Sequence, residues 1–147
     1  MPIHPMPHAG LSDLIGKPFR FGGRGPLEYD CYGLCIEVYR RKGIALPDYG
    51  SAIQPHLISR MITAAVDPDL LVFNRLKVAE PFCLVTFTIK PPYTSHIGVV
   101  LDNCRDFIHV QQGVKVCIEQ LDSILWERRI TGFYIYNTKP ETRNSKP

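Results

Sequence analysis

The chain has 147 residues, of which 45% are hydrophobic and 21% are charged. A chain of this length makes one domain the expectation, and it can bury enough surface to fold without disulfide or metal staples. No apolar run approaches the roughly 20 residues that a membrane span needs, which excludes membrane insertion. The net charge of +3 comes from 17 basic and 14 acidic residues scattered along the chain, which excludes a nucleic-acid-binding surface.

The predicted domain spans residues 11–138, between an extended arm at 1–10 and a polar tail at 139–147. Prolines at positions 2, 5 and 7 of the arm remove hydrogen-bond donors and disfavour helix. The arm also lacks the basic and apolar stretches of a secretory signal, so no export signal is expected. A short helix is predicted over Leu11 to Ile15.

A glycine-rich loop, FGGRGP at 21–26, leads into the helix that the sequence predicts most clearly. Asp30 can cap a helix that starts near Cys31 and runs to Lys42. The apolar residues at helical spacing, expected to face the core, are Cys31, Leu34, Cys35 and Val38. A second helix is predicted over residues 54–66 as ordinary core packing.

From about residue 70 the sequence changes to short segments rich in β-branched and aromatic residues, separated by Pro, Gly, Asn and Asp. The expected strands are LLVFNRL, FCLVTFTI, HIGVVL, DFIHV, VKVCIEQ and GFYIYN. Their short connections predict an antiparallel meander of about five to six strands. Helices followed by strands predict an α+β fold in which the N-terminal helices pack on the C-terminal sheet.

The motif Asp30-Cys31-Tyr32-Gly33 points most directly to chemistry, because it places a cysteine on the first turn of a helix. The helix dipole is expected to lower the pKa of that thiol by about one unit. Five cysteines without a CxxC pair leave at least one thiol free and exclude a disulfide framework. Metal binding by Cys104, His109 and Cys117 is an alternative, although their spacing matches no standard zinc motif.

A cysteine nucleophile needs a histidine partner, and two of the five histidines lie on adjacent predicted strands. His96 starts HIGVVL and His109 lies near the end of DFIHV, with Asn103 in the turn between them. A hairpin would bring both rings to one end of the sheet. The remaining histidines, expected to have surface or capping roles, are His4, His8 and His56. The residues alone leave open whether this is a catalytic site or ordinary packing.

Six ordered pieces match a known family: GKPFRFGG (16–23), YDCYGL (29–34), RRKGIALPDYG (40–50), SHIGVVLDN (95–103), FIHV (107–110) and WERRITGFYIYN (126–137). Through them the chain resembles the NlpC-type cell-wall cysteine peptidases over roughly residues 11–137. The resemblance implies a papain-like fold, cleavage of peptide bonds in bacterial peptidoglycan, and no metal or cofactor. It implies that Cys31 is the nucleophile, His96 the base and His109 the residue that orients the base.

One departure from the family's pattern concerns the oxyanion. Phe19 stands twelve residues before Cys31, where the family commonly has a tyrosine whose hydroxyl helps to hold the oxyanion. Loss of one oxyanion donor costs about 10²–10³ in rate, so Tyr29 and Tyr32 are candidate substitutes. Arg24, in the glycine-rich loop, is a candidate contact to anionic groups of the substrate.

Tyr32 also replaces the serine that the family usually has after the nucleophile. An aromatic residue there resembles the branch found in tailed-phage tail proteins and gene transfer agents. The resemblance thus implies a virion tail or tail-tip component, with peptidoglycan peptides as substrate and tail hub or tail-tip proteins as partners. Two alternatives stay open: a structural tail-tip protein with weak or no activity, and a location in the bacterial cytoplasm.

Overall fold

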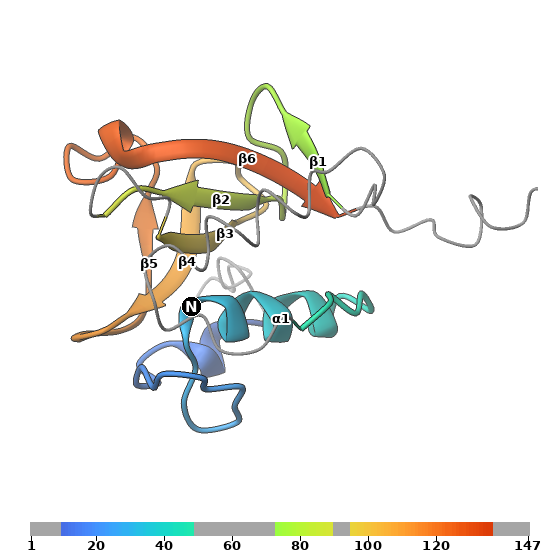
Figure 1. Ribbon diagram of the computed structural model, residues 1–147, viewed down its shortest axis with the longest axis vertical. Helices are drawn as coiled ribbons and strands as arrows, with labels where there is room; N and C mark the ends of the chain where they lie inside the picture. The colour runs from blue at the N-terminus through green and yellow to red at the C-terminus, as the bar shows by residue number, and fades with distance from the viewer. Residues whose placement is uncertain (1–9, 49–72, 90–94, 137–147) are drawn as a thin grey trace, which may run out of the picture.

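The structure is a computed structural model that describes residues 10–48, 73–89 and 95–136 (Figure 1). Its helical elements are the 3-10 turns η1 (Ser12–Leu14) and η2 (Glu127–Arg129) and the helix α1 (Cys31–Arg41). Its strands are β1 (Phe73–Leu76), β2 (Leu84–Phe87), β3 (His96–Val100), β4 (Asp106–Gln111), β5 (Val114–Gln120) and β6 (Ile130–Tyr136). All six predicted strands are therefore present in the described part of the chain.

The strands form a single antiparallel sheet in the order β1-β6-β2-β3-β4-β5. From β2 to β5 each strand pairs with the next one along the chain, as the predicted meander requires. The prediction is wrong at the other edge, because β6 returns to lie between β1 and β2. The chain after β5 is anchored over the sheet by the buried ring of Trp126, which packs edge-on against Phe87 and Phe107.

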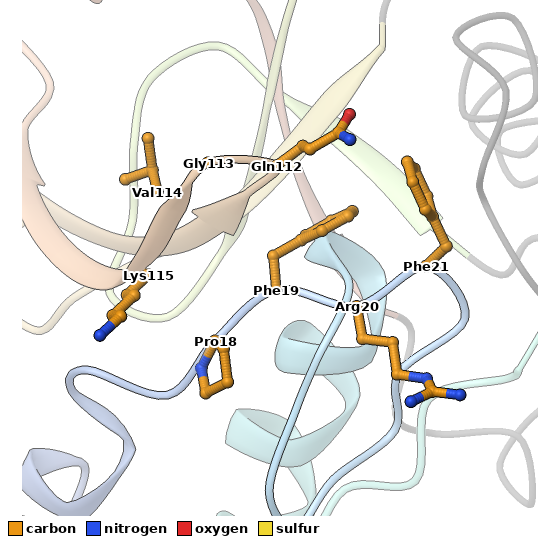
Figure 2. Close-up of a pocket in the computed structure, with 8 residues that line it drawn as sticks. All are labelled: Pro18, Phe19, Arg20, Phe21, Gln112, Gly113, Val114 and Lys115. Carbon is orange, nitrogen blue, oxygen red and sulfur yellow. The ribbon is translucent and has the colours of Figure 1, made fainter.

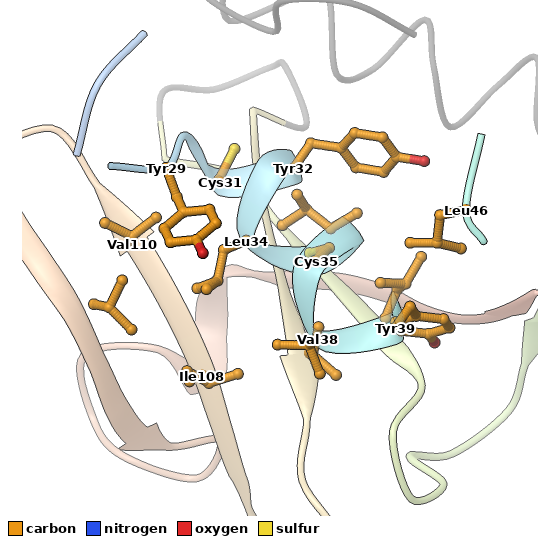
Figure 3. Close-up of a cluster of buried hydrophobic side chains, with 14 of the residues drawn as sticks. Tyr29, Cys31, Tyr32, Leu34, Cys35, Val38, Tyr39, Leu46, Ile108 and Val110 are labelled. Atoms are coloured by element: carbon orange, nitrogen blue, oxygen red, sulfur yellow. The ribbon is translucent and has the colours of Figure 1, made fainter. Parts of the chain in front are cut away.

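Helix α1 begins where the sequence predicts, because its first turn has a side-chain cap. The Asp30 carboxylate accepts a hydrogen bond from the backbone N–H of Gly33 at 2.6 Å. The helix ends at Arg41, one residue before the predicted Lys42, and Gly43 follows with a positive φ of 81°. Its buried face packs on β3 and β4, as Figure 3 shows. The predicted α+β fold, a helix packed on a six-stranded antiparallel sheet, is confirmed.

The sheet is covered on both faces by hydrophobic clusters. Alternate residues of β3, Ile97 and Val99, belong to the cluster that includes the buried face of α1. Val100 belongs to a second cluster with Phe87 and Trp126 on the opposite face. Both faces of β3 are therefore buried, which explains why HIGVV reads as a nearly continuous apolar run.

Several predictions concern residues outside the described ranges. These are the arm over residues 1–9, the helix over 54–66, the tail over 139–147, and His4, His8 and His56. The short helix predicted over residues 11–15 is present as η1. None of the helices in the described residues has the length and hydrophobicity needed to cross a membrane.

Candidate active site

Cys31 is the first residue of α1, and its side chain is only 6% exposed. Figure 3 shows its sulfur at the N-terminal end of the helix, directed away from the Leu34 and Cys35 side chains. The backbone N–H of Ile97 hydrogen-bonds the sulfur. Because Ile97 directly follows His96, the fold places the sulfur against the start of β3.

The Cys31 thiol is neutral in this structure. Burial raises its pKa to about 12, and the neighbouring Asp30 carboxylate adds to the increase. The backbone N–H groups of Ile97, Tyr32 and Cys31 lower the pKa but do not offset burial. The predicted decrease of about one unit is therefore wrong for the protein without substrate, because desolvation outweighs the helix N-terminus.

His96 and His109 are in direct contact, as the predicted hairpin requires. The Nε2 atom of His96 lies 2.8 Å from Nδ1 of His109, and the two rings are 3% and 0% exposed. The register of β3 and β4 places Gly98 beside His109. A Cβ at Gly98 would lie 3.2 Å from the His109 Cβ and 2.9 Å from the Ile108 carbonyl oxygen. The absence of a side chain at this position thus lets the two strands and the His109 ring pack closely.

A hydrogen-bonded chain continues from the histidines to β5. The Nε2 atom of His109 lies 2.8 Å from Oε2 of Glu119, and Trp126 donates from Nε1 to the other carboxylate oxygen at 2.9 Å. Glu119 is not among the residues predicted from the sequence. The alternation of VKVCIEQ contained the signal, since Cys117 and Glu119 share a strand face and Cys117 pairs with His109 in the sheet.

Burial and neighbouring charges set the protonation states of His96, His109 and Glu119. Burial, together with His109, holds the pKa of His96 well below its usual value of 6.5. Burial also lowers the pKa of His109, although Glu119 opposes the shift. Burial raises the pKa of Glu119, but hydrogen bonds from Trp126 and His109 outweigh it and leave the pKa below its usual range. Near neutral pH the pair of imidazoles is neutral and the carboxylate is ionised.

Among the residues that the structure describes, no hydrogen bond joins the Cys31 sulfur to the His96 ring. His96 bonds through Nε2 to His109, and its ring lies in the aromatic cluster with Phe87 and Trp126. The Cys31 sulfur approaches the backbone beside His96 from the face covered by α1. Catalytic hydrogen bonds are often long without substrate and shorten when it binds.

Arg24 is held by carboxylates of the protein. Its Nη1 lies 2.8 Å from Asp30, and its Nε and Nη2 each lie 3.0 Å from an oxygen of Asp48. The guanidinium offsets the charge of the buried Asp30 at the start of α1. These ion pairs occupy the guanidinium of Arg24 in the protein without substrate, and its contact with an anionic group of the substrate stays a prediction.

The tyrosines considered for the oxyanion do not face the sulfur. The Tyr32 hydroxyl donates to the Pro47 carbonyl at 2.6 Å. Figure 3 shows the Tyr32 and Tyr29 rings leading away from the Cys31 sulfur on different sides of the helix. Neither hydroxyl faces the Cys31 sulfur in this structure, and the substitution of one of them for the missing tyrosine stays a prediction.

Phe19 lies in the loop that precedes α1 and pairs with Tyr29 through an isolated bridge. Its ring packs edge-on against Phe21, with 4.9 Å between centroids. Figure 2 shows both rings beside the turn between β4 and β5, where they line an open hollow of about 440 Å³. Arg20 and Lys115 also line this hollow. At the position where the family commonly has a tyrosine, this protein therefore presents the apolar ring of Phe19 to the hollow.

One group of described side chains has the composition of a metal site. The ligand atoms of His109, Cys117 and Glu119 all lie within 4.8 Å of one another. Cys104 of the predicted alternative is not among them. In the structure these atoms interact with each other instead, since the Cys117 sulfur lies 3.7 Å from both His109 Nε2 and Glu119 Oε2.

Comparison with known proteins gives one family and several relatives. The model of the NlpC/P60 family matches residues 16–134. Two proteins, each called a probable endopeptidase p60, are 26% identical to the chain over 119 residues, one from Listeria welshimeri and one from Listeria innocua. The matches cover 81% of this chain and 20% and 22% of those proteins. The chain thus spans about a fifth of the length of the curated relatives it matches.

Solved structures share the fold. A protein of the NLP/P60 family from Staphylococcus aureus has a TM-score of 0.57 at 24% identity, covering 85% of this chain and 39% of its own. NlpC1 from Trichomonas vaginalis has a TM-score of 0.61 at 20% identity, covering 86% and 41%. The NlpC/p60 domain of the peptidoglycan hydrolase SagA has a TM-score of 0.53 at 18% identity, covering 86% and 92%.

Proposed function

The chain belongs to the NlpC/P60 family, and from this premise we propose that it is a cysteine peptidase that cleaves peptide bonds of bacterial peptidoglycan. The observation that carries the proposal is the Cys31 sulfur at the start of α1, against the backbone beside the paired histidines His96 and His109. The names of the Listeria relatives support an endopeptidase, and the SagA domain supports peptidoglycan as the substrate class.

The proposed reaction is acyl transfer through a thioester. His96 accepts the thiol proton as the Cys31 sulfur attacks the carbonyl carbon of the scissile bond. The oxyanion intermediate collapses, the C–N bond breaks, and His96 returns the proton to the leaving amine. Water, activated by His96, then attacks the thioester and releases a carboxylic acid and the Cys31 thiol. His109 holds the His96 ring in place through the 2.8 Å hydrogen bond.

Backbone groups supply the oxyanion stabilisation in this proposal. Cys31 is the first residue of an 11-residue helix, and the N–H groups of Cys31 and Tyr32 already approach the sulfur. The N-terminus of a helix stabilises negative charge. Because Phe19 offers no hydroxyl, turnover is expected to be slower than in an otherwise equal enzyme with a tyrosine there.

Digestion of purified peptidoglycan tests the proposal. The wild-type protein should release new amino groups from the wall peptides, and Cys31→Ser should abolish the release while keeping the fold. Cys104→Ser is the matched control, because this thiol lies in the turn before β4, away from the histidines. Equal release by wild type and Cys31→Ser would refute a catalytic Cys31.

A second candidate function is a structural protein that keeps the peptidase fold without turnover. The neutral, buried thiol of Cys31 and the phenylalanine at position 19 favour it. The same digestion separates the two, since a structural protein releases no amino groups even in its wild-type form.

We also propose that the protein acts as a component of a virion tail, with tail hub or tail-tip proteins as partners. What supports this is Tyr32 in place of the family's usual serine. Mass spectrometry of purified tailed particles from the organism that encodes the chain should detect it at a fixed ratio to tail-tip proteins. Recovery from the cytoplasm alone, with none in particles, would contradict this location.

A further inference from the structure

We propose that Glu119 is a positioning residue that fixes the tautomers of His109 and His96, so that His96 keeps the unprotonated nitrogen that a general base needs. This inference rests on the proposed function, in which His96 accepts the thiol proton. It extends that function by one residue, on a strand that carries none of the three proposed catalytic residues.

The position of each proton follows from the hydrogen-bonded chain. A neutral imidazole carries one N–H donor and one acceptor nitrogen. The Glu119 carboxylate only accepts, so the proton of His109 must lie on Nε2, 2.8 Å from Oε2. The Nδ1 atom of His109 is then an acceptor, and the contact at 2.8 Å requires His96 to donate from Nε2. His96 is left with an unprotonated Nδ1, the form that a general base needs.

Trp126 hydrogen-bonds the carboxylate oxygen of Glu119 that does not face His109. The indole N–H of Trp126 is a donor only, and it lies 2.9 Å from Oε1 of Glu119. The Trp126 ring is 1% exposed and packs edge-on against His109, with centroids 4.9 Å apart. Trp126 donates to one carboxylate oxygen, while His109 and, at 3.7 Å, the Cys117 thiol contact the other. The carboxylate therefore has a fixed orientation, and the aromatic cluster shields the histidine pair from water.

An amide at position 119 should reverse the donor and acceptor in both hydrogen bonds that link Glu119 to His109 and His109 to His96. In Glu119→Gln the side-chain oxygen stays with the Trp126 indole, which can only donate, and the NH₂ group faces His109. His109 Nε2 must then accept, so its proton moves to Nδ1. That proton is donated to His96 Nε2, and His96 carries its own proton on Nδ1. The base is then blocked although every side chain keeps its position.

The test compares Glu119→Gln with Glu127→Gln, which makes the same change at an exposed acid beside Trp126. Long-range ¹H–¹⁵N NMR spectra report the histidine tautomers, and turnover of a peptidoglycan-derived peptide gives kcat and KM. We expect Glu119→Gln to move the His96 proton from Nε2 to Nδ1 and lower kcat about 100-fold or more, with KM nearly unchanged. Orienting partners behind histidines are worth about 10- to 100-fold, and a wrong tautomer about 10⁴-fold. Glu127→Gln should match the wild type.

Unchanged tautomers in Glu119→Gln would overturn the inference, as would wild-type kcat. The NMR readout needs no turnover, so failure of the proposed function, seen as activity that survives in Cys31→Ser, is a separate result. If Glu119→Gln does not fold, Glu119→Asp serves as the second variant. It keeps an acceptor carboxylate, so it should retain the wild-type tautomers; a tautomer switch in Glu119→Asp would overturn the inference.

Discussion

At the scale of single residues, the two partners of the proposed reaction are both uncharged before substrate binds. Burial raises the pKa of the Cys31 thiol to about 12 and lowers that of His96 well below 6.5. A thiolate–imidazolium pair is therefore not the resting state. The attack is expected to begin from thiol and imidazole, with the proton moving as the sulfur–carbon bond forms.

The lowered pKa of His96 predicts the pH dependence of kcat/KM. His96 must be unprotonated to act as the base, and activity is lost as the pH falls through its lowered pKa. We expect kcat/KM to remain on its plateau at pH 6.5 and to fall only at lower pH. The measurement is kcat/KM from about pH 4 to 8, which reports groups of the free enzyme. Half-loss of activity at or above pH 6.5 would contradict the account.

At the scale of elements, local signals in the sequence predicted most of what the structure shows. The start of α1 could be predicted because Asp30 supplies its cap within three residues. The six strands could be predicted from their β-branched and aromatic residues, and the contact of His96 with His109 from a short hairpin. The insertion of β6 beside β2 could not, because pairing between distant strands leaves no local signal. The burial of Cys31, which reverses its predicted pKa shift, likewise depends on tertiary packing.

The close approach of β3 and β4 gives a prediction at this scale. In Gly98→Ala the new methyl group would lie 2.9 Å from the Ile108 carbonyl oxygen and 3.2 Å from the His109 Cβ. The strands must separate, so we expect a loss of about 1–3 kcal/mol in the free energy of unfolding and a weaker contact between His96 and His109. Urea unfolding and turnover measure both effects. Wild-type stability together with wild-type turnover would show that this close packing is unimportant.

At the scale of the whole molecule, one sheet connects the structural core and the candidate site. The cluster that contains α1 and the cluster that contains Trp126 pack on opposite faces of the same strands. The His96 and His109 rings pack against Trp126 of the second cluster. Cys31 belongs to the first cluster, so the candidate site draws on both faces of the folded core. Loss of the sheet should therefore remove the helix packing and the site together.

The single tryptophan of the chain makes this coupling measurable. Trp126 is buried against Phe87, Phe107 and both histidines. We expect one cooperative unfolding transition in urea, with Trp126 fluorescence and far-ultraviolet circular dichroism giving the same midpoint. A fluorescence transition at clearly lower urea would show that the site unfolds independently of α1.

The identity of the nucleophile is the central claim, and covalent labelling tests it most directly. The reagent is a peptide with the sequence of a peptidoglycan stem that carries a vinyl sulfone in place of the scissile bond, and peptide mapping by mass spectrometry locates the adduct. Cys104 and Cys117 are the more exposed thiols, so simple accessibility favours them. We expect one label for each chain, on Cys31, and the loss of this label in His96→Ala. Labelling of Cys104 or Cys117 with Cys31 unmodified would contradict that claim.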